Sequence, residues 1–337
     1  MKIDQIKEYI NNNEVRKSLN IQSNKEIDVS LLGQGEYNVN FLFINPDNNK
    51  KLVLRLNTAS QMNLDNQISY EFNVLKMLEL SGRTPKPIFV DSSMDKLPYG
   101  LLAMEFLPGV PLDYKTDLEI AASCLADIHS VDFNENNHLI TPKNPLKAIF
   151  VECVEMSSKY LNSDIGDENI KIIIKRMIEK SERSVLNIDE NLNKYNIINT
   201  ELNSGNFLIN GKGKNNYIID WEKPILGEVE QDLGHFLAPT TTFWKTDVIL
   251  TRAEMEDFVR MYIEKVNGRF ETKNLWDKLE KYIIITCLRG ITWCSMAWVE
   301  YQDPDKLIRN EFTYNKIENY LKESFLLNIE DEYFNKL

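Results

Sequence analysis

The feature of this sequence that most constrains its fold is a change of pattern at Pro108, Gly109 and Pro111. Before this break, short segments rich in Val, Leu, Ile and Phe alternate with turn residues, which is typical of β-strands. After it, most segments repeat their apolar residues with the period of an amphipathic helix. We therefore predict an α+β fold with two lobes: a small antiparallel-sheet lobe with one helix in residues 1–107, and a larger, mostly helical lobe in residues 108–337.

The order of elements adds detail to this prediction. The segments "EIDVSLLGQGEYNVNFLFI" and "KKLVLRLN" indicate two strands joined by a polar turn. The segment from Asn63 to Ser81 has a helical pattern and ends at Gly82, and two more strand patterns follow it. In the second lobe, "NFLINGKGKNNYIIDW" predicts a short hairpin among the helices.

Composition limits the partners of the chain. With 337 residues, of which 43% are hydrophobic and 27% charged, the chain can bury the cores of two lobes. Its formal net charge of −12 and its pI near 5.0 repel phosphate groups. This argues against nucleic acid and anionic membranes as partners, and it allows a cationic small molecule.

Cysteine usage and the N-terminus favour a cytoplasmic protein. No two cysteines form a close pair of the kind that binds metals, and the last two would lie two turns apart on one helix, too far for a disulfide. The N-terminus lacks the continuous apolar stretch of a signal peptide. The four cysteines are Cys124, Cys153, Cys287 and Cys294.

One segment, from Ile283 to Val299, is apolar enough to suggest a membrane span. Arg289 and Gly290 lie at its centre, and a charge there would cost roughly 2.5–3.5 kcal/mol on insertion scales. We therefore predict a buried core helix and no membrane partner.

A glycine-rich, strand-to-strand turn within the segment "LLGQGEYNVNFLF" contains Gly33, Gln34 and Gly35. Without side chains at the two glycines, backbone N–H groups can approach an anion such as a phosphate. An ordinary β-turn can have the same composition, so this motif supports a phosphate site only in combination with the motifs that follow it.

A charged pair is expected next along the chain. Arg55 stands in the strand "LVLRLN", and Glu71 stands on the helix that follows. A guanidinium held by Glu71 donates to phosphate oxygens in a fork and stays charged in any environment. The alternative is an arginine exposed on an edge strand.

The strand exit "AMEFLPG" lies where the two predicted lobes join, and it contains Met104, Glu105 and Leu107. Backbone carbonyl and amide groups at such a junction can meet the edge of adenine, while Met104 helps to line the pocket.

Two later motifs supply oxygen ligands. The loop "NTELNSGNFLI" contains Glu201 and Asn206, and Asp220 in "IIDWE" follows an apolar strand. Amide and carboxylate oxygens are hard ligands suited to Mg²⁺ and its phosphates. Each residue type is common in loops, so the prediction depends on the order of the motifs.

In this order, from Ile27 to about Tyr301, the motifs resemble the aminoglycoside phosphotransferase and choline kinase family of the protein-kinase-like fold. The chain departs from the family at one place. Where the family's catalytic loop has His-Gly-Asp, this chain has Asn199, Thr200 and Glu201.

The resemblance implies roles for single residues. Asn206 and Asp220 match the residues that bind Mg²⁺, and Arg55, supported by Glu71, matches the cation that holds the α- and β-phosphates. Glu105 and Leu107 match hinge positions that touch adenine through their backbones. Two further positions match residues that support the catalytic loop: Asp232 and Asn199, the latter in place of a histidine.

Glu201 occupies the position of the carboxylate that accepts or orients the substrate hydroxyl, and it reaches about 1.5 Å further than an aspartate would. The resemblance thus implies an ATP- and Mg²⁺-dependent kinase of a small hydroxylated molecule, aminoglycoside-like or amino-alcohol-like, with GTP as an alternative donor. The competing hypothesis is a catalytically silent relative that binds nucleotide or has a regulatory role.

Overall fold

The computed structural model of the chain describes residues 3–35, 37–60, 62, 64–134, 137–186, 195–304 and 310–336. The chain forms two compact units. The first unit comprises Met1–Leu112, Thr116–Ile140 and Gly205–Ile225, and the second comprises Asp113–Lys115, Thr141–Ser204 and Leu226–Leu337. The first unit contains a five-stranded antiparallel sheet and the second is mostly helical, so the predicted α+β fold is confirmed. The lobe boundary after residue 107 stays a prediction.

The first unit is built around its sheet. In chain order its elements are α1 (Ile3–Asn11), α2 (Asn13–Ser18), β1 (Val29–Gln34), β2 (Asn38–Ile44), β3 (Lys51–Asn57), α3 (Gln67–Leu78), η1 (Glu79–Ser81), β4 (Pro87–Asp91), β5 (Gly100–Glu105), α4 (Leu118–His129), β7 (Phe207–Leu208) and β8 (Tyr217–Ile218). The strands of the sheet lie in the order β1-β2-β3-β5-β4. The predicted hairpin forms β2 and β3, which pair from Asn38 opposite Asn57 to Ile44 opposite Lys51.

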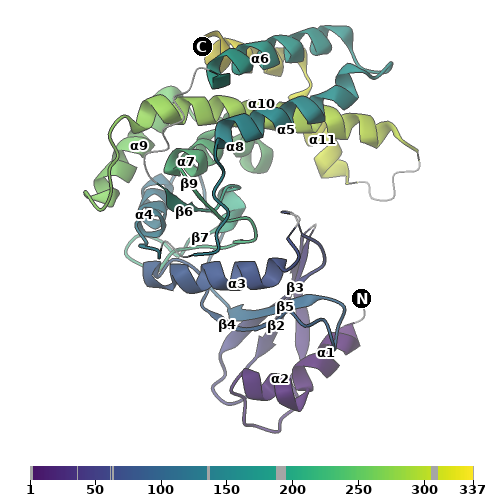
Figure 1. Cartoon of the computed structure of the whole chain (residues 1–337), viewed down its shortest axis with the longest axis vertical. Helices are drawn as coiled ribbons and strands as arrows, with labels where there is room; N and C mark the ends of the chain where they lie inside the picture. The colour runs from purple at the N-terminus through teal and green to yellow at the C-terminus, as the bar shows by residue number, and fades with distance from the viewer. Residues whose placement is uncertain are drawn as a thin grey trace. The chain divides into compact units, whose positions relative to one another are not determined.

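Helices cover the two faces of this sheet (Figure 1). α1 and α2 pack on the face that carries Phe41 of β2 and Leu54 of β3. α3 packs against β4 and β5. Because side chains alternate along β3, Arg55 points to the face opposite Leu54, where it meets Glu71 of α3. The alternation of β3 therefore separates an apolar core face from a polar face.

α3 ends at Leu78, and only together with η1 does the helical segment end where the sequence predicts. η1 continues the chain to Ser81, and Gly82 then takes φ 66°, a left-handed conformation that favours glycine. At the other end, Asn66 Oδ1 accepts a hydrogen bond from Ser69 N–H at 3.1 Å. Asn63, the predicted first residue of this helix, lies outside the described residues.

A short hairpin from later in the chain also belongs to the first unit. β7 and β8 pair with Phe207 opposite Ile218, as their sequence predicts. Val110 and Ile209 form an antiparallel bridge with N–H to O distances of 3.1 and 2.8 Å. The segment that follows β5 is thereby joined to the hairpin whose ends carry Asn206 and Asp220.

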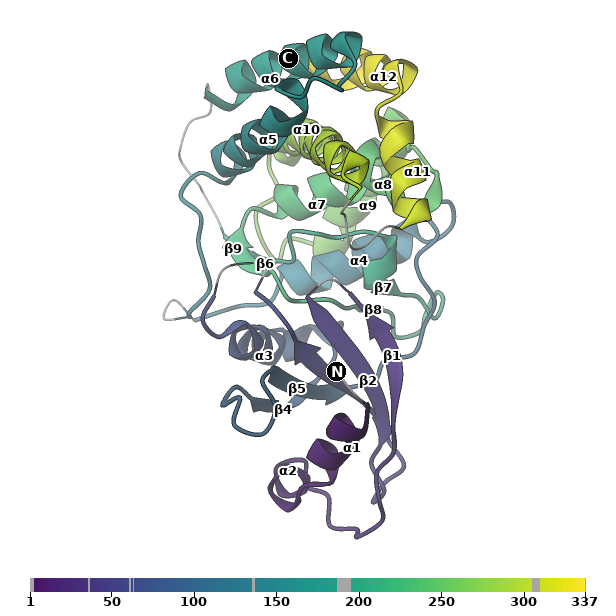
Figure 2. The ribbon, with the colours of Figure 1, turned by 90° about the vertical axis from the view of Figure 1, so that its right-hand side faces the viewer.

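The second unit is mostly helical and centred on one long helix. Its elements are α5 (Pro145–Leu161), α6 (Glu168–Leu186), β6 (Asn196–Ile198), α7 (Val229–Leu237), α8 (Pro239–Thr246), α9 (Arg252–Val266), α10 (Leu275–Gln302), α11 (Glu311–Tyr320), α12 (Glu323–Tyr333) and η3 (Phe334–Lys336). Two short elements, η2 (Ser204–Asn206) and β9 (Ile225–Gly227), have residues in both units. α10 packs against α5 and α7, which lie beside it in Figure 2. At Gly290 a side chain would come within 2.8 Å of Thr240, so the glycine allows α8 to approach.

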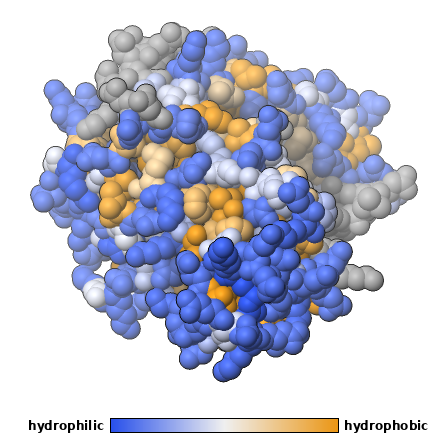
Figure 3. Space-filling view, turned by 60° about the horizontal axis from the view of Figure 1, so that its bottom comes forward, coloured by the Kyte–Doolittle hydropathy of each residue, from blue (hydrophilic) through white to orange (hydrophobic). Residues whose placement is uncertain are grey.

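α10 contains the apolar segment that suggested a membrane span. By length and composition alone it could cross a membrane, but 67% of its most apolar window is buried inside the protein. It packs as the core helix that the sequence predicts. On the face of the molecule shown in Figure 3, hydrophilic residues predominate, with groups of hydrophobic residues between them.

Candidate active site

The first part of the candidate site is an arginine that bridges two carboxylates in the first unit. Arg55 Nη1 lies 2.6 Å from Glu71 Oε1 on α3 and 3.2 Å from Asp220 Oδ1, just after β8. Arg55 Nε donates to Asn40 Oδ1 at 3.0 Å, because Asn40 is its partner across the β2–β3 ladder. The structure thus brings together three residues that are far apart in the sequence.

Burial dominates the electrostatics of this cluster. Arg55 and Glu71 are buried, whereas Asp220 is half exposed. Removal from water works against the guanidinium charge, but Glu71 and Asp220 outweigh it and raise the pKa of Arg55 above its ordinary value. Burial raises the pKa of the Glu71 carboxyl, Arg55 opposes this shift, and Asp220 adds to it. Arg55 therefore carries a permanent positive charge.

Asn206 and Asp220 stand at the end of the β7–β8 hairpin opposite its turn. Ile219 N–H donates to the Asn206 carbonyl at 2.8 Å, so the two predicted metal ligands lie on neighbouring backbone segments. Asp220 takes φ 69°, a left-handed conformation that Asp tolerates better than most residues. One amide and one carboxylate oxygen fit Mg²⁺, which takes few protein ligands and completes its shell with phosphate and water. Within the described ranges, no group of three or more His, Cys, Asp or Glu side chains could hold a metal unaided.

Contacts that the sequence did not suggest tie the segment after Asp220 to the sheet and to α3. Asn38 Nδ2, at the start of β2, donates to the Glu222 carboxylate. Gln67 Nε2, at the start of α3, donates to the Glu222 carbonyl oxygen at 2.5 Å. Polar residues are common at the first position of a strand or helix, so no signal in the sequence singled out Asn38 and Gln67.

The glycine-rich turn has room beside it. Gly33 lies within β1 next to an irregularity in the β1–β2 pairing, and Gly35 N–H donates to Asn38 O at 2.9 Å. A Cβ atom at Gly33 would meet no atom within 4 Å, so the packing of the chain itself does not require glycine there. The exposed Gln34 stands between the two glycines.

The predicted hinge residues lie at the end of β5. Met104 is buried, and Glu105 N–H donates to Lys86 O at 2.9 Å. The N–H of Leu107 has no hydrogen-bond partner in the part of the chain that the structure describes. A ligand at this edge can therefore accept from Leu107, whereas Glu105 offers only its carbonyl oxygen.

In the second unit, buried Asp232 of α7 holds the loop from Asn199 to Glu201. Its carboxylate oxygens accept from Asn199 N–H at 2.8 Å and from Thr200 N–H at 2.6 Å. Asn199 Oδ1 in turn accepts from Glu201 N–H at 3.2 Å. Thr200 takes φ 78°, which is strained for a β-branched residue.

His235 supports the same loop from the next turn of α7. Its Nδ1–H donates to the carbonyl oxygen of Leu202 at 2.8 Å. Removal from water lowers the pKa of His235, and the charge of Arg289 lowers it further, although the bond to Leu202 opposes the shift. His235 is therefore a neutral, structural histidine.

The side chain of Glu201 lies beside Arg289, the charge in the middle of α10. Arg289 Nη2 is 3.5 Å from Glu201 Oε1, and Arg289 Nε and Nη2 are 3.1 and 3.2 Å from the carboxylate oxygens of Glu152 on α5. Burial opposes the charge of Arg289, but Glu152 and Glu201 raise its pKa above the ordinary value. The sequence contained one signal for this contact, since a charge inside an apolar helix needs a partner. Nothing in the sequence marked Glu152.

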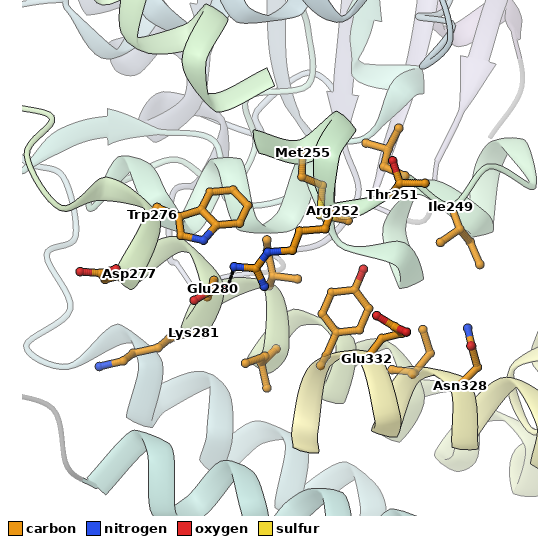
Figure 4. Close-up of a pocket in the computed structure, with 15 residues that line it drawn as sticks. Ile249, Thr251, Arg252, Met255, Trp276, Asp277, Glu280, Lys281, Asn328 and Glu332 are labelled. Atoms are coloured by element: carbon orange, nitrogen blue, oxygen red, sulfur yellow. Dashed lines mark ion pairs between the residues drawn. The ribbon is translucent and has the colours of Figure 1, made fainter. Parts of the chain in front are cut away.

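The second unit also contains a cavity of about 610 Å³ among α9, α10 and α12 (Figure 4). No predicted site residue lines it. Arg252 extends into it over the ring of Trp276, 5.4 Å from the ring centroid, and pairs with Glu280 at 2.7 Å and with Glu256 at 2.9 Å. Arg252 is thus a further arginine with two carboxylates, outside the candidate site.

Comparison with known proteins identifies the class of this chain. Residues 28–272 match the family model of the phosphotransferase enzyme family. No curated protein matches the chain. A spectinomycin phosphotransferase, solved in complex with ADP and spectinomycin, is 15% identical, with 100% of this chain and 99% of that chain covered and a TM-score of 0.68.

Two further solved structures have the same fold. A choline kinase from Cryptosporidium parvum is 15% identical, with 92% of this chain and 90% of that chain covered and a TM-score of 0.63. A microcompartment-associated aminopropanol kinase is 12% identical, with 96% and 97% covered and a TM-score of 0.67. These likenesses establish the fold, the family match establishes the type of enzyme, and the resemblance seen in the sequence is confirmed. The chain therefore belongs to the phosphotransferase enzyme family and is a small-molecule kinase with the protein-kinase-like fold.

Proposed function

We propose that the protein transfers the γ-phosphoryl group of ATP, with Mg²⁺, to a hydroxyl group of a small, amine-bearing molecule. The observation that carries this proposal is the buried pair of Arg55 and Glu71 with Asp220 beside it. The cluster combines a permanent cation for phosphate oxygens with a carboxylate for the metal. Phosphoryl transfer depends mainly on this kind of positioning and charge stabilisation.

Arg55 has a donor left for the nucleotide. Its Nε and Nη1 are engaged within the protein, while Nη2 has no hydrogen-bond partner among the residues that the structure describes. The contacts of Nε and Nη1 fix the guanidinium plane, so Nη2 can be aimed at a phosphate oxygen. Mg²⁺, held by Asn206 and Asp220, would supply the charge that neutralises the phosphates during transfer.

The rest of the nucleotide would lie along the sheet of the first unit. The Leu107 N–H and the Glu105 carbonyl are suited to the edge of adenine, with Met104 against the ring. The space beside Gly33 is suited to the phosphates. The spectinomycin phosphotransferase that shares this fold binds ADP, which supports ATP as the donor, with GTP as the alternative.

The acceptor is inferred from the charges around Glu201. Glu152 and Glu201 share one arginine, so these three part-exposed side chains carry a net charge of −1. A cationic nitrogen on the acceptor would balance that charge while its hydroxyl meets Glu201. Two of the structural neighbours are a choline kinase and an aminopropanol kinase. Choline and aminopropanol each contain a hydroxyl group and a cationic nitrogen.

One observation favours a catalytically silent relative instead. Asn199, Thr200 and Glu201 stand where the resemblance implies His-Gly-Asp, and Thr200 takes φ 78°, which glycine would adopt without strain. Loss of the general base would cost about 10²–10⁴-fold in rate without abolishing nucleotide binding. Binding and turnover therefore have to be measured separately.

Two assays on the wild-type protein separate these functions. Thermal shifts with ATP, with and without Mg²⁺, report nucleotide binding. ADP release over a panel of choline, ethanolamine, aminopropanol, aminoglycosides and amine-free sugars reports transfer. We expect a Mg²⁺-dependent shift together with turnover of an amine-bearing acceptor. A shift without any turnover would support the silent relative, and the absence of both would contradict nucleotide binding itself.

A further inference from the structure

We propose that Arg289 is a positioning residue for Glu201 and that Glu152 holds Arg289 in place for that task. The inference rests on the proposed function, in which Glu201 accepts the proton of the acceptor hydroxyl. Three elements converge at this point, since Arg289 projects from α10, Glu152 from α5 and Glu201 from the loop before η2.

The contacts of Arg289 are unequal. Its Nε and Nη2 donate to the two carboxylate oxygens of Glu152 at 3.1 and 3.2 Å, a fork that fixes the plane of the guanidinium group. The same Nη2 is 3.5 Å from Glu201 Oε1, at the outer limit of a hydrogen bond. Arg289 is therefore anchored on Glu152, and its hold on Glu201 is light enough for a substrate hydroxyl to compete.

Glu201 needs such a guide more than an aspartate would. Its additional methylene adds a rotatable bond, so the carboxylate can take more orientations from the same backbone. Proton acceptance requires an oxygen within about 2.6–3.2 Å of the hydroxyl, and a misplacement of about 1 Å can cost about 10²-fold in rate. The charge of Arg289 selects the orientations of Glu201 that point toward α10.

Arg289 and the loop of Glu201 are held in place by different contacts. Arg289 stands on a core helix that packs against α5 and α7, next to the close approach of Gly290 and Thr240. The loop of Glu201 is held separately, through its backbone, by Asp232. A substitution at Arg289 should therefore move the side chain of Glu201 without releasing the loop.

Steady-state kinetics in a double-mutant cycle test the proposal. On the best acceptor of the wild type, Arg289→Met should lower kcat about 10–100-fold while the KM for ATP stays within about 3-fold. In a Glu201→Gln background, Arg289→Met should lower kcat by no more than about 2-fold further, because the group that it positions is gone. Arg289→Lys keeps the charge but loses the fork, so it should recover part of kcat.

Arg252→Met is the matched control. Arg252 also bridges two carboxylates, Glu256 and Glu280, but outside the candidate site. Its loss should leave kcat at the wild-type value. A fall equal to that of Arg289→Met would show that the loss of any such arginine disturbs the second unit, and would overturn the assignment.

Other outcomes also decide the proposal. The same fold-loss from Arg289→Met in both backgrounds, or wild-type kcat in a folded Arg289→Met protein, would overturn it and leave the proposed function standing. If Arg289→Met shows no thermal shift with ATP and Mg²⁺, this variant is not folded, and the double-mutant cycle is repeated with Arg289→Lys and with Glu152→Gln in its place. Each of these should lower kcat by a smaller factor, about 3–10-fold. No turnover of any acceptor by the wild type would overturn the proposed function and this inference with it.

Discussion

Arg55 of the first unit and Arg289 of the second unit make the same kind of contact in opposite surroundings. We name them the buried cluster, Arg55 with Glu71 and Asp220, and the open cluster, Arg289 with Glu152 and Glu201. The arginine and its nearer carboxylate are 7% and 2% exposed in the buried cluster, and 26% and 43% exposed in the open cluster. The shortest N–O distance is 2.6 Å in the first and 3.1 Å in the second.

Under the proposed function, this difference would separate two tasks of the enzyme. A buried ion pair cannot rearrange cheaply, because each charge lacks water and depends on its partner. Such a pair suits the nucleotide phosphates, which are the same in every turnover. A half-exposed cluster exchanges partners with water and ligands at little cost. It suits an acceptor, whose hydroxyl and amine have to displace existing contacts.

The largest expected effect on the free energy of unfolding comes from replacing the arginine of each cluster. Arg55→Met leaves Glu71 buried without its cation and should lower the free energy of unfolding by about 3–5 kcal/mol. Arg289→Met should lower it by about 1 kcal/mol or less, because water reaches the remaining carboxylates. Urea unfolding followed by circular dichroism measures both. Equal losses would show that burial does not distinguish the two clusters.

The next prediction concerns the metal side of the buried cluster. ATP at 100 times its Kd should stabilise the wild type by about 2.7 kcal/mol, and Asp220→Ala and Asn206→Ala should each remove the Mg²⁺-dependent part of that gain, since each loses an oxygen ligand. Thermal shifts with and without Mg²⁺ give the result. Asp257→Ala, which removes an exposed carboxylate of α9, is the control and should keep the full shift. An undiminished shift in the Asp220→Ala/Asn206→Ala double variant would contradict the metal assignment.

Glu230 extends the comparison to a largely buried carboxyl whose pKa is affected by no arginine among the described residues. Burial raises the pKa of Glu230 to about 6, from an ordinary value of 4.5. The folded state therefore binds this proton more tightly than the unfolded state, so the stabilisation is present below pH 4.5 and is lost as the pH rises through about 6. Glu230→Gln should match the wild type near pH 4 and exceed it by up to about 2 kcal/mol at pH 8. A stability difference that does not depend on pH would contradict the shift.

The smallest expected effect concerns the backbone beside Glu201. Thr200 at φ 78° is strained, so Thr200→Gly relieves strain but loses conformational entropy on folding, with a net gain of about 0–1 kcal/mol in the free energy of unfolding. Asn267 also has a left-handed conformation, φ 49°, but Asn tolerates it, so Asn267→Gly should change stability less. Chemical denaturation of both variants provides the comparison. A loss larger than about 1 kcal/mol for Thr200→Gly would show that the threonine side chain stabilises the loop.

The sequence predicted the parts of this molecule that depend on local pattern. The hairpin of β2 and β3, the end of the α3–η1 segment before Gly82 and the core position of α10 follow from periodicity and turn residues, which act over a few positions. The order of the motifs predicted the family. Local sequence pattern was therefore sufficient to predict the fold, although each motif alone was ambiguous.

The partners of the charged residues could not be predicted in the same way. Arg289 meets Glu201 only because α10 packs beside the loop of Glu201, and Glu152 reaches Arg289 from a third element. Glu222 is bound by Asn38 and Gln67 for the same reason. These contacts depend on how distant elements pack, and no spacing in the sequence encodes them.

Glu201 as the working carboxylate is tested most directly by the kcat of Glu201→Gln on an acceptor that the wild type phosphorylates. The substitution keeps the size and shape of the side chain but removes its ability to accept a proton. We expect kcat to fall by about 10²–10⁴-fold with little change in nucleotide affinity. Glu201→Asp should not raise kcat above the wild-type value, because the site with Arg289 is built around the longer side chain. Full turnover by Glu201→Gln would contradict the assignment and leave the proton to another acceptor, such as an oxygen of the transferred phosphate.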